Sequence, residues 1–322
     1  MAHILVTGGA GFIGSYLCER YVENGHQVVA LDMSDGQKVE HLTNKKNFQF
    51  IQGSVLDNHL MRYEIDKSDI VVHLAAIADP KKYVDSPLNV LEIDLRASLN
   101  IFSYAAEKKK KIFFASTSEI FGKNMNIPWK EDDNRVLGSS KINRWCYSTA
   151  KAACEHYLFA YYQQEKLPFV AVRFFNAYGP RLDDLGSGRV IPIFLKHFLS
   201  GDPVYIHGDG KQTRTFVYIE DVAQALYDLT FCEKCEGEIF NIGTEREVSI
   251  LELAEVMKKV GGFTSDIKFV PHKEVFGESY EDIPRRVPNV SKVKEFIGWE
   301  ATTSFEEGLK KTIEYYRSRH GL

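Results

Sequence analysis

The sequence predicts an α/β fold in which a doubly wound parallel sheet carries helices on both of its faces. Three observations predict it. Apolar runs typical of buried strands alternate with segments of helical spacing. The first strand runs directly into a glycine-rich turn and a helix, and the second strand ends in an acid. Ligands of such sheets bind beyond the carboxyl ends of the strands.

The strands of this Rossmann-type sheet can be assigned in order along the chain. We expect them at residues 4–6, 27–32, 48–51, 70–76, 112–116, 169–176 and 238–243. Helical spacing follows at residues 15–22, 88–107 and 147–166. After residue 176, short helices alternate with Gly-, Pro- and Asp-containing segments, which is typical of a smaller lobe. We therefore expect a cofactor-binding domain at residues 1–176, to which residues 216–243 return, and an interleaved C-terminal substrate-binding lobe at 177–215 and 244–322.

Composition excludes several classes of protein. The 322 residues are 44% hydrophobic and 26% charged, with a net charge of −4, which argues against a nucleic-acid or anionic-membrane binder. The basic run at 108–111 is typical of a solvated helix end. No apolar run is long enough to span a bilayer, and the chain begins directly in a strand, so we predict no secretory signal. Five scattered cysteines, with Cys232 and Cys235 as a single Cys-x-x-Cys pair, favour a cytoplasmic protein without a metal site.

The turn Thr-Gly-Gly-Ala-Gly-Phe-Ile-Gly at residues 7–14 predicts a dinucleotide site. Gly8 allows the tight turn, Gly11 lets a pyrophosphate approach the backbone, and Gly14 lets helix and strand pack closely. The phosphates would then lie at the positive end of the following helix. Asp32 would hold the ribose hydroxyls of NAD and repel the 2′-phosphate of NADP. The plainer alternative is an ordinary glycine turn beside a strand-end acid.

Other residues complete the predicted cofactor site. Small residues after the strand at 70–73 leave room for the cofactor, whereas His73 itself is interpreted as a hydrogen-bonded core residue. The residues expected at NAD are Gly8, Gly11, Phe12, Ile13, Gly14, Asp32, Ser54, Val55, Leu74, Ala75, Ala76, Tyr147, Lys151 and Phe174.

Tyr147 and Lys151 are the predicted catalytic pair. They are four residues apart, so a helix places them on the same face. An ammonium beside a phenol stabilises the phenolate, and we therefore expect Lys151 to lower the pKa of Tyr147. Such a tyrosine can take a proton from a substrate hydroxyl while NAD takes the hydride. Thr117, at a hydroxyl-rich strand end, can hydrogen-bond the reacting oxygen; the alternative is that it only caps the strand.

These motifs together resemble the extended short-chain dehydrogenase/reductase family, specifically its nucleotide-sugar enzymes. The likeness extends from residues 7–14 through 117–122, 147–151, 173–181 and 208–216 to 298–299. It implies that Thr117, Tyr147 and Lys151 are catalytic, and that the protein is a homodimer formed through the helices at 88–107 and 147–166. The family often has asparagine at the position of Asp94 and aspartate at that of Ser54. The resemblance implies a substrate site of Thr117, Ser118, Asn176, Arg189, Val190, Tyr205, Arg214 and Arg286. Arginine suits a nucleotide diphosphate; the less favoured alternative is that Arg189 or Arg214 forms a surface ion pair.

Glu119 narrows the expected chemistry. The order Thr-Ser-Glu at 117–119 looks like that of UDP-glucuronate decarboxylases and GDP-mannose 4,6-dehydratases, in which the acid can move protons at the sugar 5-carbon. The segment 278–288 looks like the decarboxylase branch, where Arg286 or Arg285 would face the substrate carboxylate. Related epimerases use an arginine here for the pyrophosphate. Glu119 could instead only hydrogen-bond its loop.

The sequence therefore predicts an NAD-dependent enzyme that oxidises a nucleotide sugar transiently at its 4-position. UDP-glucuronate decarboxylation is the preferred reaction, because a 4-ketone is beta to the carboxylate and Thr117 and Tyr147 would stabilise the enolate. A UDP-sugar 4-epimerase and a 4,6-dehydratase are the alternatives. A non-enzyme alternative is an NAD-bound regulatory or scaffold protein.

Overall fold

A seven-stranded parallel sheet forms the centre of the protein. The computed structural model describes residues 1–186, 188–271, 283 and 285–321. Each strand pairs in parallel with its neighbour. The chain fills one half of the sheet from β1 to β3 and then returns to fill the other half from β4 onward, so the predicted doubly wound fold is confirmed. The strand order is β10 (Glu238–Ile242), β6 (Phe169–Phe174), β5 (Lys111–Thr117), β4 (Ile70–His73), β1 (His3–Thr7), β2 (Gln27–Asp32) and β3 (Phe48–Gln52).

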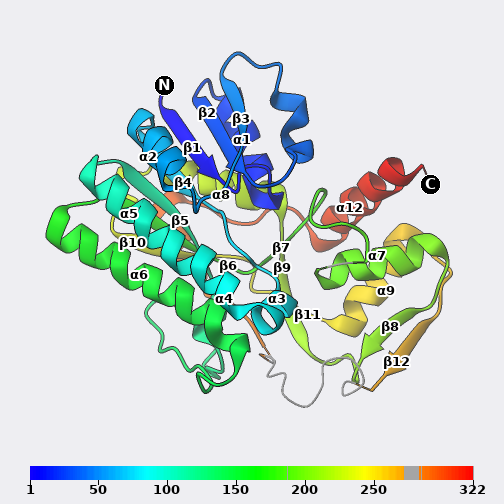
Figure 1. Ribbon diagram of the computed structural model, residues 1–322. Helices are drawn as coiled ribbons and strands as arrows, with labels where there is room; N and C mark the ends of the chain where they lie inside the picture. The colour runs from blue at the N-terminus through cyan, green and yellow to red at the C-terminus, as the bar shows by residue number, and fades with distance from the viewer. Residues whose placement is uncertain (187, 272–282, 284, 322) are drawn as a thin grey trace.

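Helices cover both faces of this sheet (Figure 1). One face packs against α1 (Phe12–Glu23) and α8 (Ile219–Phe231), and the other against α2 (Asn58–Lys67), α5 (Ser98–Glu107) and α6 (Cys146–Glu165). Successive side chains of a strand point to opposite faces. In β1, Ile4 and Val6 accordingly join the core under α1, whereas Leu5 joins the core under α6. Burial on both faces explains why the strands read as continuous apolar runs.

Smaller elements gather beside the carboxyl ends of the sheet. A three-stranded sheet has the order β11 (Glu247–Ser249), β9 (Thr213–Tyr218) and β7 (Asn176–Tyr178), and β8 (Val204–His207) pairs with β12 (Ile267–Val270). Figure 1 shows α7 (Val190–Ser200), α9 (Ile250–Gly261) and α12 (Phe305–His320) beside these strands. The helix α11 (Ser291–Ile297) packs instead on β10. The expected division into two domains stays a prediction.

Three predicted elements differ from the structure. β4 ends at His73 and not at residue 76, because its partner β1 ends opposite it at Thr7 and enters the glycine turn. β6 ends at Phe174, opposite the end of β5, and Asn176 pairs with β9 instead. The segment 88–107 is not one regular α-helix: α4 (Pro87–Leu91) continues into the π-helix η2 (Glu92–Ala97) and then into α5.

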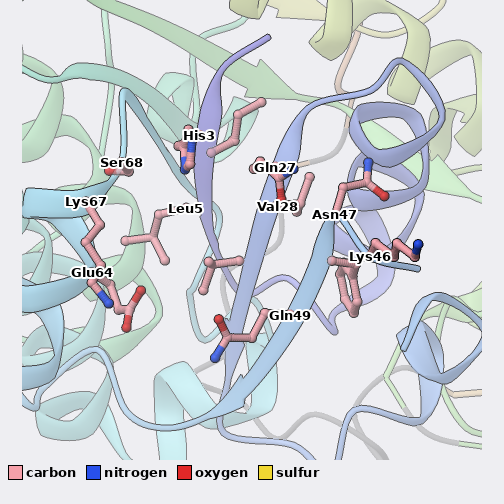
Figure 2. A pocket seen from close by; sticks show the side chains of 13 residues that line it. His3, Leu5, Gln27, Val28, Lys46, Asn47, Gln49, Glu64, Lys67 and Ser68 are labelled. Carbon is pink, nitrogen blue, oxygen red and sulfur yellow. The ribbon is translucent and has the colours of Figure 1, made fainter. Parts of the chain in front are cut away.

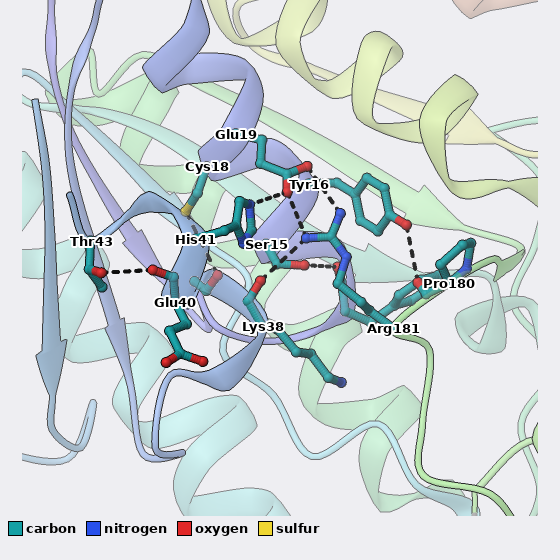
Figure 3. A network of polar contacts seen from close by, with 12 residues as sticks. Ser15, Tyr16, Cys18, Glu19, Lys38, Glu40, His41, Thr43, Pro180 and Arg181 are labelled. Atoms are coloured by element: carbon teal, nitrogen blue, oxygen red, sulfur yellow. Dashed lines mark hydrogen bonds and ion pairs between the residues drawn. The ribbon is translucent and has the colours of Figure 1, made fainter. Parts of the chain in front are cut away.

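An arginine cluster joins the segment after β7 to α1 (Figure 3). The Arg181 guanidinium donates to both oxygens of Glu19, at 2.7 and 3.0 Å, and lies 3.7 Å from the centre of the Tyr16 ring. Tyr16 in turn donates to the carbonyl of Pro180 at 3.2 Å, and His41 pairs with Glu19. Because α1 begins at the glycine turn, this cluster fixes the smaller elements relative to that turn.

Cysteine pairing departs from the sequence-based expectation. Cys232 and Cys235 form a disulfide, whereas Cys18, Cys146 and Cys154 are free. Among the residues described, no helix is both long and apolar enough to cross a membrane. In the same residues, no group of three or more His, Cys, Asp and Glu side chains is arranged to hold a metal ion.

Candidate active site

Two hollows lie at opposite ends of the central sheet. One, of about 450 Å³, opens at the amino ends of β1, β2 and β3, where Lys46, Glu64 and Lys67 line it (Figure 2). The other, of about 370 Å³, lies at the carboxyl ends beside the glycine turn. Because ligands of doubly wound sheets bind at the carboxyl ends, the second hollow is the candidate active site.

The structure brings most of the predicted cofactor residues together around the second hollow. Ser54 is the exception: it does not line the hollow, and its hydroxyl accepts from the backbone N–H of Leu56 at 3.2 Å. The predicted residues that line it are Gly8, Gly11, Phe12, Ile13, Gly14, Asp32, Val55, Leu74, Ala75, Ala76, Tyr147, Lys151 and Phe174. Gly53, which the sequence placed in a segment that could border the adenine, also lines it, and the residues that sequence reasoning missed are Leu31, Met33, Ile77, Ala78, Ile93, Ala115 and Ser116.

The glycine turn forms a tight backbone cradle. A side chain at Gly11 or Gly14 would collide with the backbone of the turn itself. Gly8 has a φ of +71°, in the left-handed region that favours glycine. A Cβ atom on Gly14 would lie 2.1 Å from the carbonyl oxygen of Gly8, and one on Gly11 would lie 3.0 Å from the same atom. The backbone N–H groups that open α1 are therefore accessible to a ligand, and this fits the pyrophosphate of a dinucleotide.

Asp32 is held by two backbone donors. Its Oδ2 accepts from the N–H of Ala10 in the glycine turn at 3.1 Å, and its Oδ1 accepts from the N–H of Ser34 at 2.9 Å. A carboxylate at this point of the hollow suits the two hydroxyls of a ribose.

Tyr147 and Lys151 lie in the first turns of α6 and both line the hollow. The Tyr147 ring stacks on Tyr83 of α3 (Pro80–Asp85), with the ring centres 4.6 Å apart. The Thr117 side chain, at the end of β5, is near enough to the phenol to lower its pKa, and its hydroxyl accepts from the N–H of Glu119 at 3.2 Å.

The expected lowering of the Tyr147 pKa is wrong for this structure. Burial raises the pKa of Tyr147 well above its ordinary value, and the carboxylates of Asp94 and Glu119 raise it further, while Thr117 and Arg189 lower it. The Lys151 ammonium lies 5.9 Å from the centre of the phenol ring and pairs with Asp94. Desolvation and two nearby anions thus outweigh the single cation on which the expectation rested.

Lys151 and Asp94 form a buried ion pair at the wall of the hollow. The Lys151 Nζ lies 3.5 Å from Asp94 Oδ1, and the side chains are 1% and 0% exposed. Burial raises the pKa of Asp94, and Lys151 offsets part of that rise. Neither Nζ nor Oδ1 has a hydrogen-bond partner among the described residues. A buried donor without a partner at this wall fits the ribose hydroxyls of a bound dinucleotide.

Glu119 lies between two arginines. It belongs to the short 3₁₀-helix η3 (Ser118–Phe121), which Thr117 caps. Arg144 donates to its Oε2 at 2.6 Å and Arg286 to its Oε1 at 3.1 Å, all with buried or nearly buried side chains. Burial alone would raise the pKa of Glu119, but the two guanidinium groups outweigh it and hold that pKa below its usual value. Glu119 is therefore ionised. Sequence reasoning missed Arg144, although it lies one helical turn before Tyr147.

Arg189 is the predicted substrate residue that lines the hollow; it also pairs with Asp183 at 3.2 Å. The ion pair predicted as the alternative is present, and the contact with a nucleotide diphosphate stays a prediction. Asn176 donates to the carbonyl of Thr215 at 2.9 Å, and Arg214 donates to that of Thr213 at 2.8 Å. The other predicted substrate residues do not line the hollow, nor does the predicted catalytic residue Glu119. These substrate residues are Thr117, Ser118, Asn176, Val190, Tyr205, Arg214 and Arg286.

The two candidate arginines of the segment 278–288 have different partners. Residues 278–282 and 284 lie outside the described part of the chain. Arg285 pairs with Glu247, and its side chain is 52% exposed. Arg286 pairs with Glu119, its side chain is 11% exposed, and its Nε has no hydrogen-bond partner among the described residues. Of the two, Arg286 is the residue that reaches the active-site carboxylate.

His73 is a hydrogen-bonded core residue, as predicted. Its Nδ1 bonds the Thr7 hydroxyl at 2.7 Å, and its Nε2 bonds the Ser98 hydroxyl at 2.9 Å. Burial, with a smaller contribution from the Lys151 charge, lowers the pKa of His73 to about 3. His73 is therefore neutral, and the positive charge near Asp94 is that of Lys151.

The chain is similar to known proteins over most of its length. Residues 4–243 match the model of the NAD dependent epimerase/dehydratase family. Over 314 residues the chain is 40% identical to a UDP-N-acetyl-alpha-D-glucosaminuronate decarboxylase of Bacillus cytotoxicus, with 97% of each chain covered. The fold is similar to the X-ray structure of Pal from Bacillus thuringiensis, with a TM-score of 0.89, 32% identity and coverage of 98% of this chain and 99% of that one. It is also similar to a UDP-glucose 4-epimerase from Thermotoga maritima solved with UDP-glucose, with a TM-score of 0.88, 32% identity and 99% of each chain covered.

Proposed function

The chain belongs to the NAD dependent epimerase/dehydratase family, and we propose that it removes the carboxyl group of a UDP-linked hexuronate as carbon dioxide. The predictions of an NAD-dependent enzyme that modifies nucleotide sugars, and of NAD as its cofactor, are confirmed. The decarboxylase at 40% identity supports the choice of reaction. The observation that carries it is Arg286, a nearly buried cation beside Glu119 whose Nε has no hydrogen-bond partner within the part of the chain that the structure describes.

The residues of the hollow fit NAD. The cradle at Gly8, Gly11 and Gly14 would hold the pyrophosphate and Asp32 one ribose. Lys151 Nζ, which has no hydrogen-bond partner in the described part of the chain, would hold the other ribose. NAD, when bound, supplies a hydride acceptor for the sugar 4-carbon.

Tyr147 is proposed to take the proton of the sugar 4-hydroxyl. A general base must lie within hydrogen-bond reach of that proton, and the Thr117 hydroxyl beside the phenol can bond the same oxygen. Lys151 would hold the phenolate in place electrostatically. The raised pKa of Tyr147 makes the phenol a strong base once it is ionised.

Carbon dioxide then leaves from the 4-keto sugar by breaking the bond between the 5-carbon and the carboxyl carbon. The bonding electrons pass to the 4-oxygen as an enolate, which Tyr147 and Thr117 would stabilise by hydrogen bonds. A proton returns to the 5-carbon, and the hydride that NAD would have accepted returns to the 4-carbon with a proton to its oxygen, so that the net loss is one carbon dioxide. We propose that Arg286 orients the carboxylate, since a guanidinium matches its two oxygens.

The role proposed for Glu119 changes from that expected from the sequence. A carboxyl group held ionised by Arg144 and Arg286 has no proton to donate and is a weak base. We therefore propose that Glu119 anchors Arg286 and does not move the proton at the 5-carbon.

The relative at 40% identity makes a 2-acetamido uronate the first sugar to test, with UDP-glucuronate as the second. The protein would be incubated with NAD and each uronate, and separately with UDP-glucose and UDP-N-acetylglucosamine, and the products followed by mass spectrometry. We expect a product lighter by one carbon dioxide from a uronate. Release of no carbon dioxide from either uronate would overturn the proposal.

A 4-epimerase is the second candidate, because the solved epimerase from Thermotoga maritima is 32% identical over nearly the whole chain. An isomer of unchanged mass in the same assay would favour it. Loss of water from a neutral hexose would favour a 4,6-dehydratase. Bound NAD without turnover on any of these sugars would favour a regulatory or scaffold protein.

We also propose a homodimer. Leu88 at the start of α4, and Tyr157, Phe159 and Tyr162 on α6, are large apolar side chains that are 36–71% exposed on the two helices expected at the interface. Sedimentation as a monomer at micromolar concentration would contradict this proposal.

We retain the cytoplasm as the proposed location. The free thiols of Cys18, Cys146 and Cys154 support it, whereas the disulfide of Cys232 and Cys235 is unusual there. Alkylation of thiols in intact cells before purification would report the state of that pair.

A further inference from the structure

Asp94 is held at the wall of the active site from several directions. It lies in the π-helix η2, between α4 and α5. Its backbone carbonyl accepts from Ser98 Oγ at 2.9 Å and from Cys154 Sγ of α6 at 3.3 Å. Its side chain is therefore presented to α6 from a fixed backbone.

The two carboxylate oxygens of Asp94 have separate partners. Oδ2 accepts from the N–H of Ile77 at 3.1 Å, in the loop after β4 that lines the hollow. Oδ1 faces Lys151 Nζ at 3.5 Å, and no hydrogen bond satisfies either atom in the described chain. The pair is fully buried, so its charges are little screened by water.

We propose that Asp94 is a positioning residue: its carboxylate holds Lys151 and the Ile77 loop in place, and its charge partly cancels the cation that favours the Tyr147 phenolate. An asparagine could accept the same hydrogen bond from Ile77. The negative charge is therefore the property that the aspartate adds. This inference rests on the proposed role of Tyr147 as the base.

Several charged or titratable groups face Tyr147 from the elements packed around it. Asp94 and Glu119 are the anions, so removing either charge favours the phenolate. In the described part of the chain, the groups around Tyr147 are Tyr83 of α3, Asp94 of η2, Glu119 of η3, Cys146 and Lys151 of α6, and Arg189 at the start of α7. Arg144 and His73 are charged or titratable neighbours of these groups.

The test is the pH dependence of Tyr147 in the Asp94→Asn enzyme. The ultraviolet absorbance of tyrosinate would be titrated in the NAD-loaded protein, with the Tyr147→Phe form of each variant subtracted to isolate Tyr147. The pH profile of kcat would be measured in parallel. We expect Asp94→Asn to move both midpoints down by about one pH unit, because a nearby like charge shifts a pKa by roughly that amount or more.

Asp221→Asn is the matched control. Asp221 is also a nearly buried carboxylate that accepts from a backbone N–H, that of Thr303, at 3.0 Å, but it lies on α8 away from the hollow. Its variant should leave both midpoints unchanged. Asp94→Ala, which removes the charge and the hydrogen bond together, must move the midpoints in the same direction as Asp94→Asn.

Unchanged midpoints in Asp94→Asn, with only a lower rate, would show a purely structural role and overturn the inference. An absorbance midpoint that moves in an enzyme that turns over no uronate would support the inference and refute the proposed reaction. A tyrosinate signal that does not depend on Tyr147 in any variant would overturn both.

Discussion

Two buried carboxylates near Tyr147, Asp94 and Glu119, are held in different ways. Asp94 accepts one backbone hydrogen bond, from Ile77, and faces one cation, Lys151, at 3.5 Å; its pKa is raised by burial. Glu119 accepts from two guanidinium groups at 2.6 and 3.1 Å, and its pKa is lowered because these two charges outweigh burial. The number of cations near each carboxylate, and whether they hydrogen-bond it, therefore decides whether its pKa is raised or lowered. Asp94 can adjust the charge of the catalytic pair, whereas Glu119 is a fixed anchor.

The largest expected effect comes from removing the phenol on which both carboxylates act. Tyr147→Phe should lower kcat by about a thousandfold, since it removes a general base. Binding of NAD should persist, because the cradle and Asp32 are untouched. Uronate turnover and calorimetric titration with NAD measure the two effects.

Tyr157→Phe is the matched control on the same helix, since Tyr157 is 47% exposed and lies outside the hollow. It should retain the wild-type rate. If Tyr147→Phe turned over the uronate at a rate close to that of the control, Tyr147 would not be the general base. The effects of its two anionic neighbours on its pKa would then have no bearing on catalysis.

Glu119→Gln tests whether the second carboxylate is an anchor. Removing the anion from between Arg144 and Arg286 should lower the free energy of unfolding by about 3 kcal/mol near neutral pH, because two buried cations lose their partner. A carboxyl group whose folded pKa is depressed contributes stability above its unfolded pKa, near 4.5, and loses it as the pH falls through the folded value.

The difference in unfolding free energy between wild type and Glu119→Gln should therefore be constant at neutral pH and shrink below about pH 4.5. Urea unfolding across the acid range measures it. A difference that grows as the pH falls would mean that Glu119 is protonated in the folded protein, and that it resembles Asp94 more than the structure indicates.

Arg286→Ala separates a carboxylate-binding from a pyrophosphate-binding role. We expect a loss of about a hundredfold in kcat/KM for a uronate, in line with the removal of a charged hydrogen-bonding partner. Binding of UDP-glucose, which has no carboxylate, should change little. Equal weakening of both ligands would assign Arg286 to the pyrophosphate.

The neighbouring Arg285→Ala is its matched control. Arg285 differs from Arg286 in being about half exposed and in pairing with Glu247. Exposed pairs contribute little, so turnover should stay close to that of wild type.

Local patterns were sufficient to predict the strands, the glycine turn and the placement of Tyr147 and Lys151 on one helix beside the hollow. The glycine spacing at 8–14 and the pair Tyr147 and Lys151 are encoded within single elements, where periodicity and turn geometry apply. Features set by tertiary contact were missed or wrong. The pKa of Tyr147 depends on burial and on Asp94 and Glu119, and the Arg144 contact joins elements 25 residues apart. The ends of β4 and β6 depend on where their neighbours end.

A third carboxylate, Asp32, extends the comparison, because backbone N–H groups hold it and no arginine or lysine pairs with it among the described residues. Asp32→Asn keeps an acceptor for one of these donors but removes the charge. We expect the Kd for NAD to rise about tenfold, since a hydrogen bond to a charged group contributes roughly 1.5 kcal/mol or more. Discrimination against NADP should also fall, because the carboxylate repels the 2′-phosphate. Asp35→Asn, at an exposed turn, is the control and should bind NAD as wild type does. Calorimetric titration with both dinucleotides measures this, and wild-type protein that preferred NADP would refute the role assigned to Asp32.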